Sequence, residues 1–224
     1  MSDRAVDTTA RAGMFGVRAR KKVRRGPYLH HFLLPMAPLV TFLHQLQPLS
    51  PALTAALTAS VVREEWPAHH RLLAPGQVAR RVYFLETGLV RGYTLLHGRE
   101  ISSWFMQAGD LAISIVSFFT QQPSDEYIEL LEPALVHSIT YEQLQQLYRD
   151  FPEFNFIGRQ LLEKYYVLSE QRARHLRAHN AAERYALLLR DFPTVFQRVA
   201  VQHIASHLGM APETLSRLRN AGQR

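Results

Sequence analysis

The stretch RVAVQHIASHLGMAPETLSRLRN, residues 198–220, decides how the C-terminal part of this chain folds. Its first apolar residues recur at the i, i+3, i+4, i+7 spacing that forms one face of a helix. These residues are Val201, Ile204, Ala205 and Leu208. Gly209 follows at once, where a helix commonly ends in the left-handed region, and Pro212 suits the start of a second helix. The pattern predicts two short helices joined by a glycine-containing turn.

The second helix has two distinct faces. Leu215 and Leu218 form its apolar side, whereas polar residues share the other side at helical spacing. Two short helices joined in this way are typical of a helix-turn-helix, whose second helix enters the major groove of DNA. An ordinary helical hairpin with a solvated polar face fits the pattern as well.

Several residues of this motif have the chemistry to contact DNA. Arg217 can donate two hydrogen bonds to guanine, and Glu213 can accept from cytosine. Thr214 and Ser216 suit phosphate or a thymine methyl, and Gln202 in the first helix suits phosphate. The predicted DNA-contacting set is Gln202, Glu213, Thr214, Ser216, Arg217 and Asn220.

The distribution of charge agrees with a polyanionic partner. Residues 1–27 hold eight Lys/Arg and two Asp, and residues 159–224 hold eleven Lys/Arg and five Asp/Glu. Residues 28–158 hold seven Arg and twelve Asp/Glu, so an acidic body lies between two basic ends. Basic ends favour double-stranded DNA, because neutralising phosphates releases counterions.

Composition excludes several other classes. The chain has no cysteine, which excludes disulfides, cysteine-ligated metals and thiol chemistry. It has no stretch of ~18 uninterrupted apolar residues and no signal-peptide pattern, so we expect a cytoplasmic protein without membrane contact. Residues 1–27 read as a disordered basic tail. A mitochondrial presequence, or a translation start at Met14 or Met36, would also explain them.

Short β segments are expected between residues 66 and 140. Turn residues punctuate this region about every ten positions, and the segments between them are β-branched or aromatic, as in an antiparallel barrel or sandwich. Those segments are VYFLE, LVRGYTLL, EISSWFM and ALVHSIT. His97-Gly98 suits a tight hairpin. The fold class predicted is α+β, with an antiparallel β-roll.

Helices are expected on both sides of the β region. Ser50-Pro51 reads as a cap and first turn, and residues 142–149 and 181–192 are predicted to be helical. Residues 153–178 are predicted to form one long helix with an apolar stripe. The stripe would either pack on the sheet or join two copies of the chain. We favour a homodimer through Leu161, Tyr165 and Leu168.

The sequence resembles the Crp/Fnr family of bacterial transcription regulators over residues 38–220. The run IASHLGMAPETLSRLR carries the closest likeness, and further matches follow in family order. They are LSPALTAAL, LLAPGQ, VYFLETGLVRGY, the AGD of 108–110, the long helix, and AAERYALLLRDFP. The resemblance implies a protein that is not an enzyme and that has DNA, a second copy of itself and RNA polymerase as partners.

The resemblance also implies a division of the chain. Residues 28–152 would form a cyclic-nucleotide-binding-like β-roll, 153–179 a dimerisation helix, and 180–224 a winged-helix-like DNA-binding domain, with few residues after Asn220 for a wing. Glu213 and Arg217 stand at the family's base-reading positions, and Gln202 at a phosphate-contacting one. Pro212 replaces a frequent arginine, and Ala211 a capping Ser or Thr, so the DNA sequence recognised should differ.

The ligand motif departs further from the family. Family members that bind cyclic nucleotides use a Gly-Glu pair and a downstream arginine, whereas this chain has Gly109-Asp110 and an acidic segment at 122–127. A cyclic phosphate would meet repulsion there, so we predict that cAMP does not bind tightly. A cAMP-responsive regulator remains the alternative. A different, unidentified effector is expected, with Arg91, Arg99, Gly109 and Asp110 as candidate pocket residues.

A cupin-like metalloenzyme is the alternative from another class. Such enzymes need a His-x-His pair and a further ligand on barrel strands. The β region offers His97 and His137 beyond the pair at 69–70, without that spacing. His175 and His179 lie four apart but lack an evident third ligand. We therefore expect no metal and no cofactor.

Overall fold

The computed structural model describes residues 37–221. The basic tail predicted at residues 1–27 lies outside this range. Within it, two four-stranded antiparallel sheets form a β-roll, in the orders β1-β8-β3-β6 and β2-β7-β4-β5. The strands are β1 (Val62–Trp66), β2 (Arg71–Leu73), β3 (Arg81–Thr87), β4 (Leu89–Leu96), β5 (Arg99–Gln107), β6 (Leu111–Ala112), β7 (Tyr127–Leu130) and β8 (Ala134–Thr140). The predicted α+β class with an antiparallel β-roll is confirmed.

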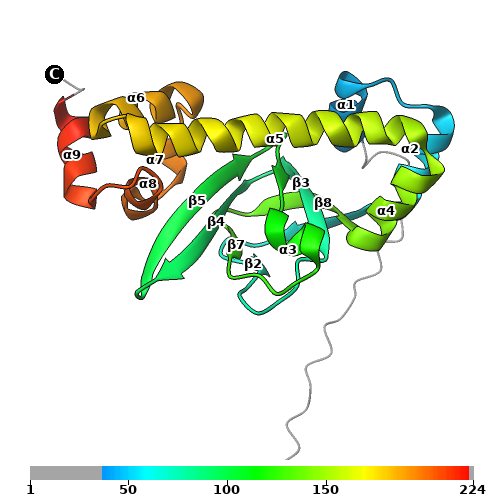
Figure 1. The fold of residues 1–224 in the computed structure, drawn as a ribbon, viewed down its shortest axis with the longest axis horizontal. Coiled ribbons are helices and arrows are strands. Elements are labelled where there is room, and N and C mark those ends of the chain that lie inside the picture. The colour runs from blue at the N-terminus through cyan, green and yellow to red at the C-terminus, as the bar shows by residue number, and fades with distance from the viewer. Residues whose placement is uncertain (1–36, 222–224) are drawn as a thin grey trace, which may run out of the picture. The chain divides into compact units, whose positions relative to one another are not determined.

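Helices lie before, within and after the roll. They are α1 (Ala37–Leu46), α2 (Pro51–Ser60), α3 (Ile115–Thr120), α4 (Tyr141–Asp150), α5 (Pro152–Ala178), α6 (Ala181–Asp191), α7 (Val195–Arg198), α8 (Val201–His207) and α9 (Pro212–Ala221). In Figure 1, α5 runs along the roll, with α1, α2 and α4 near its first half and α6 to α9 near its C-terminal end. Sequence reasoning did not predict the short helices α3 and α7.

Local sequence explains where the main helices begin. The Ser50 hydroxyl accepts a hydrogen bond from the Leu53 amide at 3.1 Å, which confirms the predicted cap of α2. Asn180 and Glu183 form a capping box in which each side chain bonds the other's backbone amide. This box starts α6 two residues after α5 ends, and it fixes a sharp boundary between the two helices.

Two tight features shape the β4–β5 hairpin. His97 and Gly98 have φ values of 51° and 75°, the positive-φ pair that a type I′ turn requires. Further along the hairpin, Gly92 lies directly beneath the indole of Trp104, where any Cβ would overlap the ring. Glycine at position 92 therefore allows Trp104 to lie flat against β4.

Three apolar clusters stabilise the fold. One fills the roll, and a second joins α1, α2, α4 and the start of α5 to β3 and β8. The third unites α6 to α9 with Leu89 of the roll, which is fully buried there. The C-terminal helices therefore share a core with the β-roll. Among the described residues, no helix is long and apolar enough to cross a membrane.

The long helix packs differently from our dimer prediction. Leu161 is half-buried against the second cluster, and the Tyr165 hydroxyl accepts a hydrogen bond from the Leu111 amide at 2.9 Å. Of the three predicted interface residues, Leu168 is exposed, at 47%. Leu161 and Tyr165 face the same chain because the helix lies on the roll along this stripe.

Candidate nucleic-acid interface and ligand cavity

Helices α8 and α9 form the two-helix unit predicted from the sequence. Ile204, Ala205 and Leu208 of α8 and Leu215 of α9 are buried together. Gly209 joins the helices with φ +63°, the left-handed conformation that ends a helix without strain in glycine. Because the apolar faces meet, the opposite face of α9 is left free.

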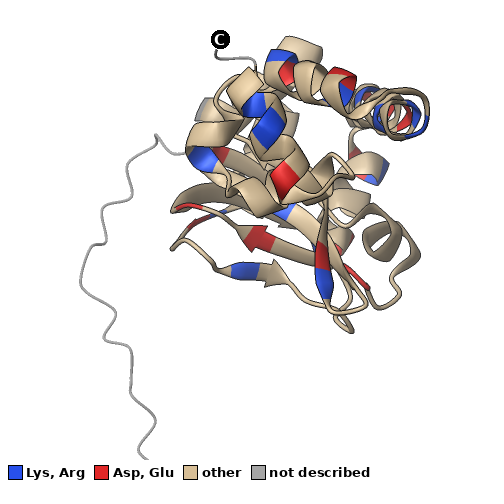
Figure 2. Cartoon of the chain, turned by 90° about the vertical axis from the view of Figure 1, so that its left-hand side faces the viewer, with Lys and Arg blue, Asp and Glu red and all other residues tan. Residues whose placement is uncertain are grey.

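The free face of α9 carries the polar residues that we predicted to contact DNA. Glu213, Ser216, Arg217 and Asn220 are all exposed, and Thr214 is half-buried. The Arg217 guanidinium contacts the Thr214 hydroxyl at 3.3 Å. Figure 2 views the molecule from the side on which the C-terminal helices lie and shows Lys and Arg residues among them; α9 carries Arg217 and Arg219.

Gln202 lies on α8 and is exposed, as a phosphate contact requires. Other residues of α8 attach this helix to β5, a role that sequence reasoning missed. The Ser206 hydroxyl accepts a hydrogen bond from the Ser102 amide at 3.1 Å. His203 and His207 lie on the same side and contact arginines of the roll and of α5.

Arg91, one of our candidate pocket residues, is one of these arginines and belongs to a buried ion cluster. It is 3% exposed and pairs with Glu129 and Glu100, each at 2.7 Å. Its Nη1 also lies 2.7 Å from Nδ1 of His203. Arg91 is buried because β4 is the strand between β7 and β5, with α8 packed above. Burial and the nearby Arg91 charge lower the pKa of His203.

Arg172 of α5 is the second arginine at this junction, and it is half-buried. It donates to Nδ1 of His207 at 2.6 Å and to the carbonyl of Ser102 at 3.2 Å. Burial lowers the pKa of Arg172 to about 10. Burial and the Arg172 charge lower the pKa of His207 to about 3, so this ring is neutral at physiological pH. Arg172 thereby links α5, β5 and α8.

Two further arginines hold the C-terminal helices. Arg198, the last residue of α7, forms an ion pair with Glu132 and donates to the carbonyl of Gly88 at 3.2 Å. Arg184 of α6 donates to the carbonyls of His179 and Leu208, at 2.6 and 2.7 Å. The α6–α9 helices are thus tied to the roll and to the end of α5 by polar contacts as well as by apolar packing.

The candidate pocket residues are not brought together. Arg99 is exposed at the start of β5, whereas Gly109 and Asp110 follow the other end of that strand. The Asp110 carboxylate accepts from the Gln107 amide at 3.3 Å and lies 3.8 Å from Nζ of Lys164. Burial raises the pKa of Asp110. Asp110 therefore stabilises the turn after β5 and the contact of this turn with α5.

The acidic segment at 122–127 lies beside Trp104. The indole Nε1 of Trp104 donates to the Glu126 carboxylate at 2.9 Å. Ser124 is buried, and its hydroxyl lies 3.2 Å from that of Ser114. Burial raises the pKa of Glu126. An aromatic ring and a carboxyl group therefore occupy the part of the roll where the resemblance would place a cyclic phosphate.

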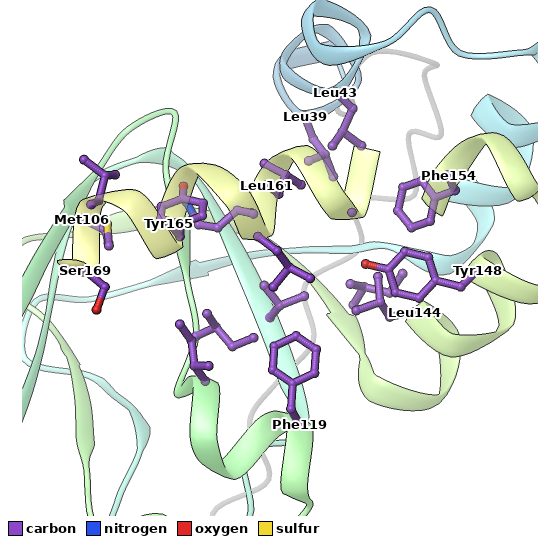
Figure 3. Close-up of a pocket in the computed structure, with 18 of the residues that line it drawn as sticks. Leu39, Leu43, Met106, Phe119, Leu144, Tyr148, Phe154, Leu161, Tyr165 and Ser169 are labelled. Carbon is purple, nitrogen blue, oxygen red and sulfur yellow. The ribbon is translucent and has the colours of Figure 1, made fainter. Parts of the chain in front are cut away.

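A cavity of about 270 Å³ lies between the roll and α5. Figure 3 shows Leu161, Tyr165 and Ser169 of α5 along it, with Leu39 and Leu43 of α1 near one end. Its lining is almost wholly aliphatic or aromatic. The polar side chains in it are Trp104, Tyr148, Tyr165, Ser169 and Arg172.

Sequence reasoning missed Arg172, although a signal for it exists. Leu161, Tyr165, Leu168 and Leu176 make an apolar stripe, and Arg172 stands within it at the same spacing. A charge inside an apolar stripe is costly unless it has a partner or a ligand. His203 and His207 offered no comparable signal. Within residues 37–221, the structure gathers no cluster of three metal-ligating side chains.

Comparison with known proteins agrees with this geometry. Residues 63–151 match the family model of the cyclic nucleotide-binding domain. No curated protein sequence matches the chain. Among solved structures, the c-di-GMP responsive global regulator CLP of Xanthomonas campestris is 21% identical, with a TM-score of 0.62 over 78% of this chain and 92% of that one.

Two other solved structures are similarly close. FixK2 of Bradyrhizobium japonicum is 20% identical, with a TM-score of 0.61 over 72% of this chain and 83% of that one. A protein assigned as a transcriptional regulator of the Crp/Fnr family, from Eubacterium rectale, is 16% identical, with a TM-score of 0.62 over 82% and 88%. Residues 63–151 therefore form a cyclic nucleotide-binding domain, and the chain has the fold of Crp/Fnr regulators, as the sequence resemblance implied.

Proposed function

We propose that this chain, a cyclic nucleotide-binding domain followed by a two-helix C-terminal unit, is a DNA-binding transcription regulator of Crp/Fnr type. The exposed face of α9 is the observation that carries this proposal. It presents Glu213, Ser216, Arg217 and Asn220 on a helix whose other side is buried. Side chains of these types, projecting from the second helix of such a unit, read base edges in the major groove.

The protein acts as a homodimer. Leu162, Tyr166 and Leu176 are exposed on α5, and with Ser169 and Ala173 they follow one another at spacings of four, three, four and three residues. That alternation is the repeat of a two-helix seam, and small residues in its middle let two helices approach closely. This seam takes the place of the interface through Leu161 and Tyr165. It would set two copies of α9 in successive major grooves, ~34 Å apart.

Cyclic AMP is not the effector. Glu126 and Trp104 occupy the part of the roll where a cyclic phosphate would need a cation, and Asp110 bonds its own turn. A carboxylate facing a phosphate is repulsive in a site with little water. Calorimetric titration should therefore give no binding of cAMP at micromolar concentration; micromolar affinity would contradict this part of the proposal. Contact with RNA polymerase belongs to the proposal as the route by which bound dimers change transcription.

Selection from random duplex DNA tests the proposal. Purified protein is incubated with the pool at moderate salt, and retained duplexes are sequenced. The expected result is an inverted repeat with half-sites about one helical turn apart. Recovery of no motif, with retention that disappears steeply as salt rises, would leave only non-specific attraction of phosphates and would overturn it.

A variant of the base-reading face makes the selection specific to α9. Glu213→Gln replaces an acceptor of cytosine amino groups with an amide and leaves the buried core unchanged. The variant should select a repeat altered at one base pair in each half-site. An unchanged repeat would place recognition elsewhere in the protein.

A further inference from the structure

The cavity between the β-roll and α5 combines two features that seldom occur together. Its walls are aliphatic and aromatic side chains from several elements, including Val82, Leu111 and Ile139 of the strands. Arg172 is also among the residues that line it. In Figure 3, Met106 and Ser169 lie at one end of the cavity, and Tyr148 and Phe154 at the opposite one; Arg172 follows Ser169 by about one helical turn on α5.

Arg172 is half-buried and lacks the carboxylate partner that a guanidinium in such a position normally has. Its contacts among the described residues are the ring of His207 and the carbonyls of Ser102 and His207, and no carboxylate of residues 37–221 pairs with it. Its neighbour Arg91, in contrast, has two carboxylates at 2.7 Å. A half-buried charge with only neutral acceptors is incompletely compensated. An anion entering the cavity would supply the missing charge.

The other side of Arg172 is less suited to an anion. A second cleft of about 280 Å³ meets Arg172 there, between α5, α6 and α8. It is also lined by Asp110 and Asp191, whose carboxylates would repel a negative ligand, and by Arg184, whose guanidinium already donates to the carbonyls of His179 and Leu208. The apolar cavity has no Asp or Glu in its lining. A ligand carboxylate would therefore reach Arg172 from the apolar side.

We propose that this cavity binds an organic monocarboxylate with an apolar body, whose carboxylate pairs with Arg172. The body occupies the space among the leucines of α1, α5 and the strands. A cavity of ~150 Å³ holds benzene, so about 270 Å³ accepts a body of roughly twice that size. Ligands of ~10–12 non-hydrogen atoms fit this estimate.

Ligand binding would also change how the C-terminal helices are attached to the roll. The consequence for DNA affinity rests on the proposed DNA-binding function. A carboxylate on Arg172 competes with Nδ1 of His207 and the carbonyl of Ser102 for the same N–H groups. Because these two bonds link α5 to α8 and β5, occupancy changes how firmly α8 is held on the roll. The apparent affinity for DNA should change with ligand, in whichever direction the released arrangement favours.

Direct binding is measured independently of DNA. Trp104 lines the cavity and Trp66 does not, so Trp66→Phe leaves one reporting indole. Decanoate and 4-phenylbutyrate are titrated into this full-length variant and followed by Trp104 fluorescence, with 1-decanol as the neutral probe and cAMP as a further comparison. The two carboxylates should bind at micromolar to submillimolar concentration, 1-decanol about 10-fold more weakly or worse, and cAMP not at all.

Two variants separate the head group from the body. Arg172→Gln should weaken decanoate about 10- to 100-fold and leave 1-decanol within twofold, because only the charged bond is lost. Leu161→Phe, which adds bulk inside the cavity, should weaken both probes. Circular dichroism and sedimentation confirm that each variant remains folded and has the oligomeric state of the parent.

Three outcomes would overturn the proposal. One is the absence of binding by either carboxylate to folded parent protein. Another is equal loss of decanoate and 1-decanol in Arg172→Gln, which would make Arg172 structural. The third is carboxylate binding that appears only when the dimer is dissociated, which would mean that a second copy fills the cavity. A DNA-binding failure would change none of these readouts, so the two proposals fail separately.

Discussion

The Nη1 atom of Arg91 lies 2.7 Å from Nδ1 of His203, and this contact joins a buried strand of the roll to α8, the first helix of the unit that we propose to bind DNA. The Arg91 guanidinium also forms ion pairs with Glu129 and Glu100. The neutral ring of His203 accepts from a guanidinium that is already paired. The position of α8 on the roll is therefore set partly by an ion cluster inside the sheet.

Arg91→Met should destabilise the protein by ~3–5 kcal/mol, because it leaves Glu129 buried without a counter-charge. Urea unfolding followed by circular dichroism gives the free energy of unfolding. Arg99→Met is the matched control, since Arg99 is exposed on the next strand, and its effect should stay within ~0.5 kcal/mol. Adding Glu129→Leu to Arg91→Met should restore much of the loss. Equal effects of the two arginine variants would show that the cluster does not matter.

The exposed seam of α5 gives a prediction about assembly. Replacing Leu162 and Tyr166 together by Glu places like charges across the proposed interface and should convert the dimer to monomer, measured by analytical ultracentrifugation. Phe156→Glu is the control, because Phe156 is as exposed as Leu162, at 54% against 50%, but lies on another side of the helix. A dimer that survives the double variant and dissociates with Phe156→Glu would place the interface elsewhere.

Acid should weaken the attachment of α8 through His207. Its pKa is lowered from 6.5 to about 3 in the folded protein, so the unfolded chain binds the proton first as pH falls. The contribution of the neutral His207 ring to the free energy of unfolding is fully present above pH 6.5 and is lost progressively as the pH falls toward 3. Relative to His207→Gln, the parent should lose about 2 kcal/mol more between pH 7 and pH 5.

Urea unfolding at a series of pH values measures this difference. His97→Gln, at the exposed tip of the hairpin, is the control and should follow the parent at every pH. Parallel curves for the parent and His207→Gln would mean that this ring titrates normally.

Gly92 offers a test of the packing inside the roll. Gly92→Ala would place a Cβ into the Trp104 indole and should cost ~1–3 kcal/mol of unfolding free energy. Trp104→Leu in the same chain should recover part of that cost by making room. Gly92→Ala with unchanged stability would show that the indole moves aside freely.

The sequence predicted the elements whose signal is local. The apolar spacing of α8, the left-handed Gly209, the cap of α2 and the His97-Gly98 turn depend on neighbouring residues, and all are present. Which stripe of α5 faces the roll was not predictable, because helical spacing alone does not distinguish a contact within the chain from a contact between chains. Leu161 and Tyr165, which we predicted at a dimer interface, pack against the same chain for this reason.

The arginines that contact α8 escaped prediction for a different physical reason. Arg91 and Arg172 meet their partners across 38 and 35 positions of sequence, on elements brought together only by the fold. A strand such as β4, buried on both faces, has no alternation from which to infer the side on which Arg91 lies. The DNA-contacting positions were easier to propose because exposed polar residues on a short helix require no partner in the chain.

The role of α9 can be measured most directly with the duplex that the selection recovers. Its affinity is determined for the parent, Arg217→Ala and Arg149→Ala over a range of salt concentrations, with random duplex as competitor. Arg149 is exposed on α4 and controls for loss of a positive charge. Arg217→Ala should lose ~1–3 kcal/mol of binding free energy per half-site, about 5- to 150-fold, and should discriminate less between selected and random duplex. Equal affinity of the parent and Arg217→Ala for the selected duplex would contradict the claim that α9 reads DNA.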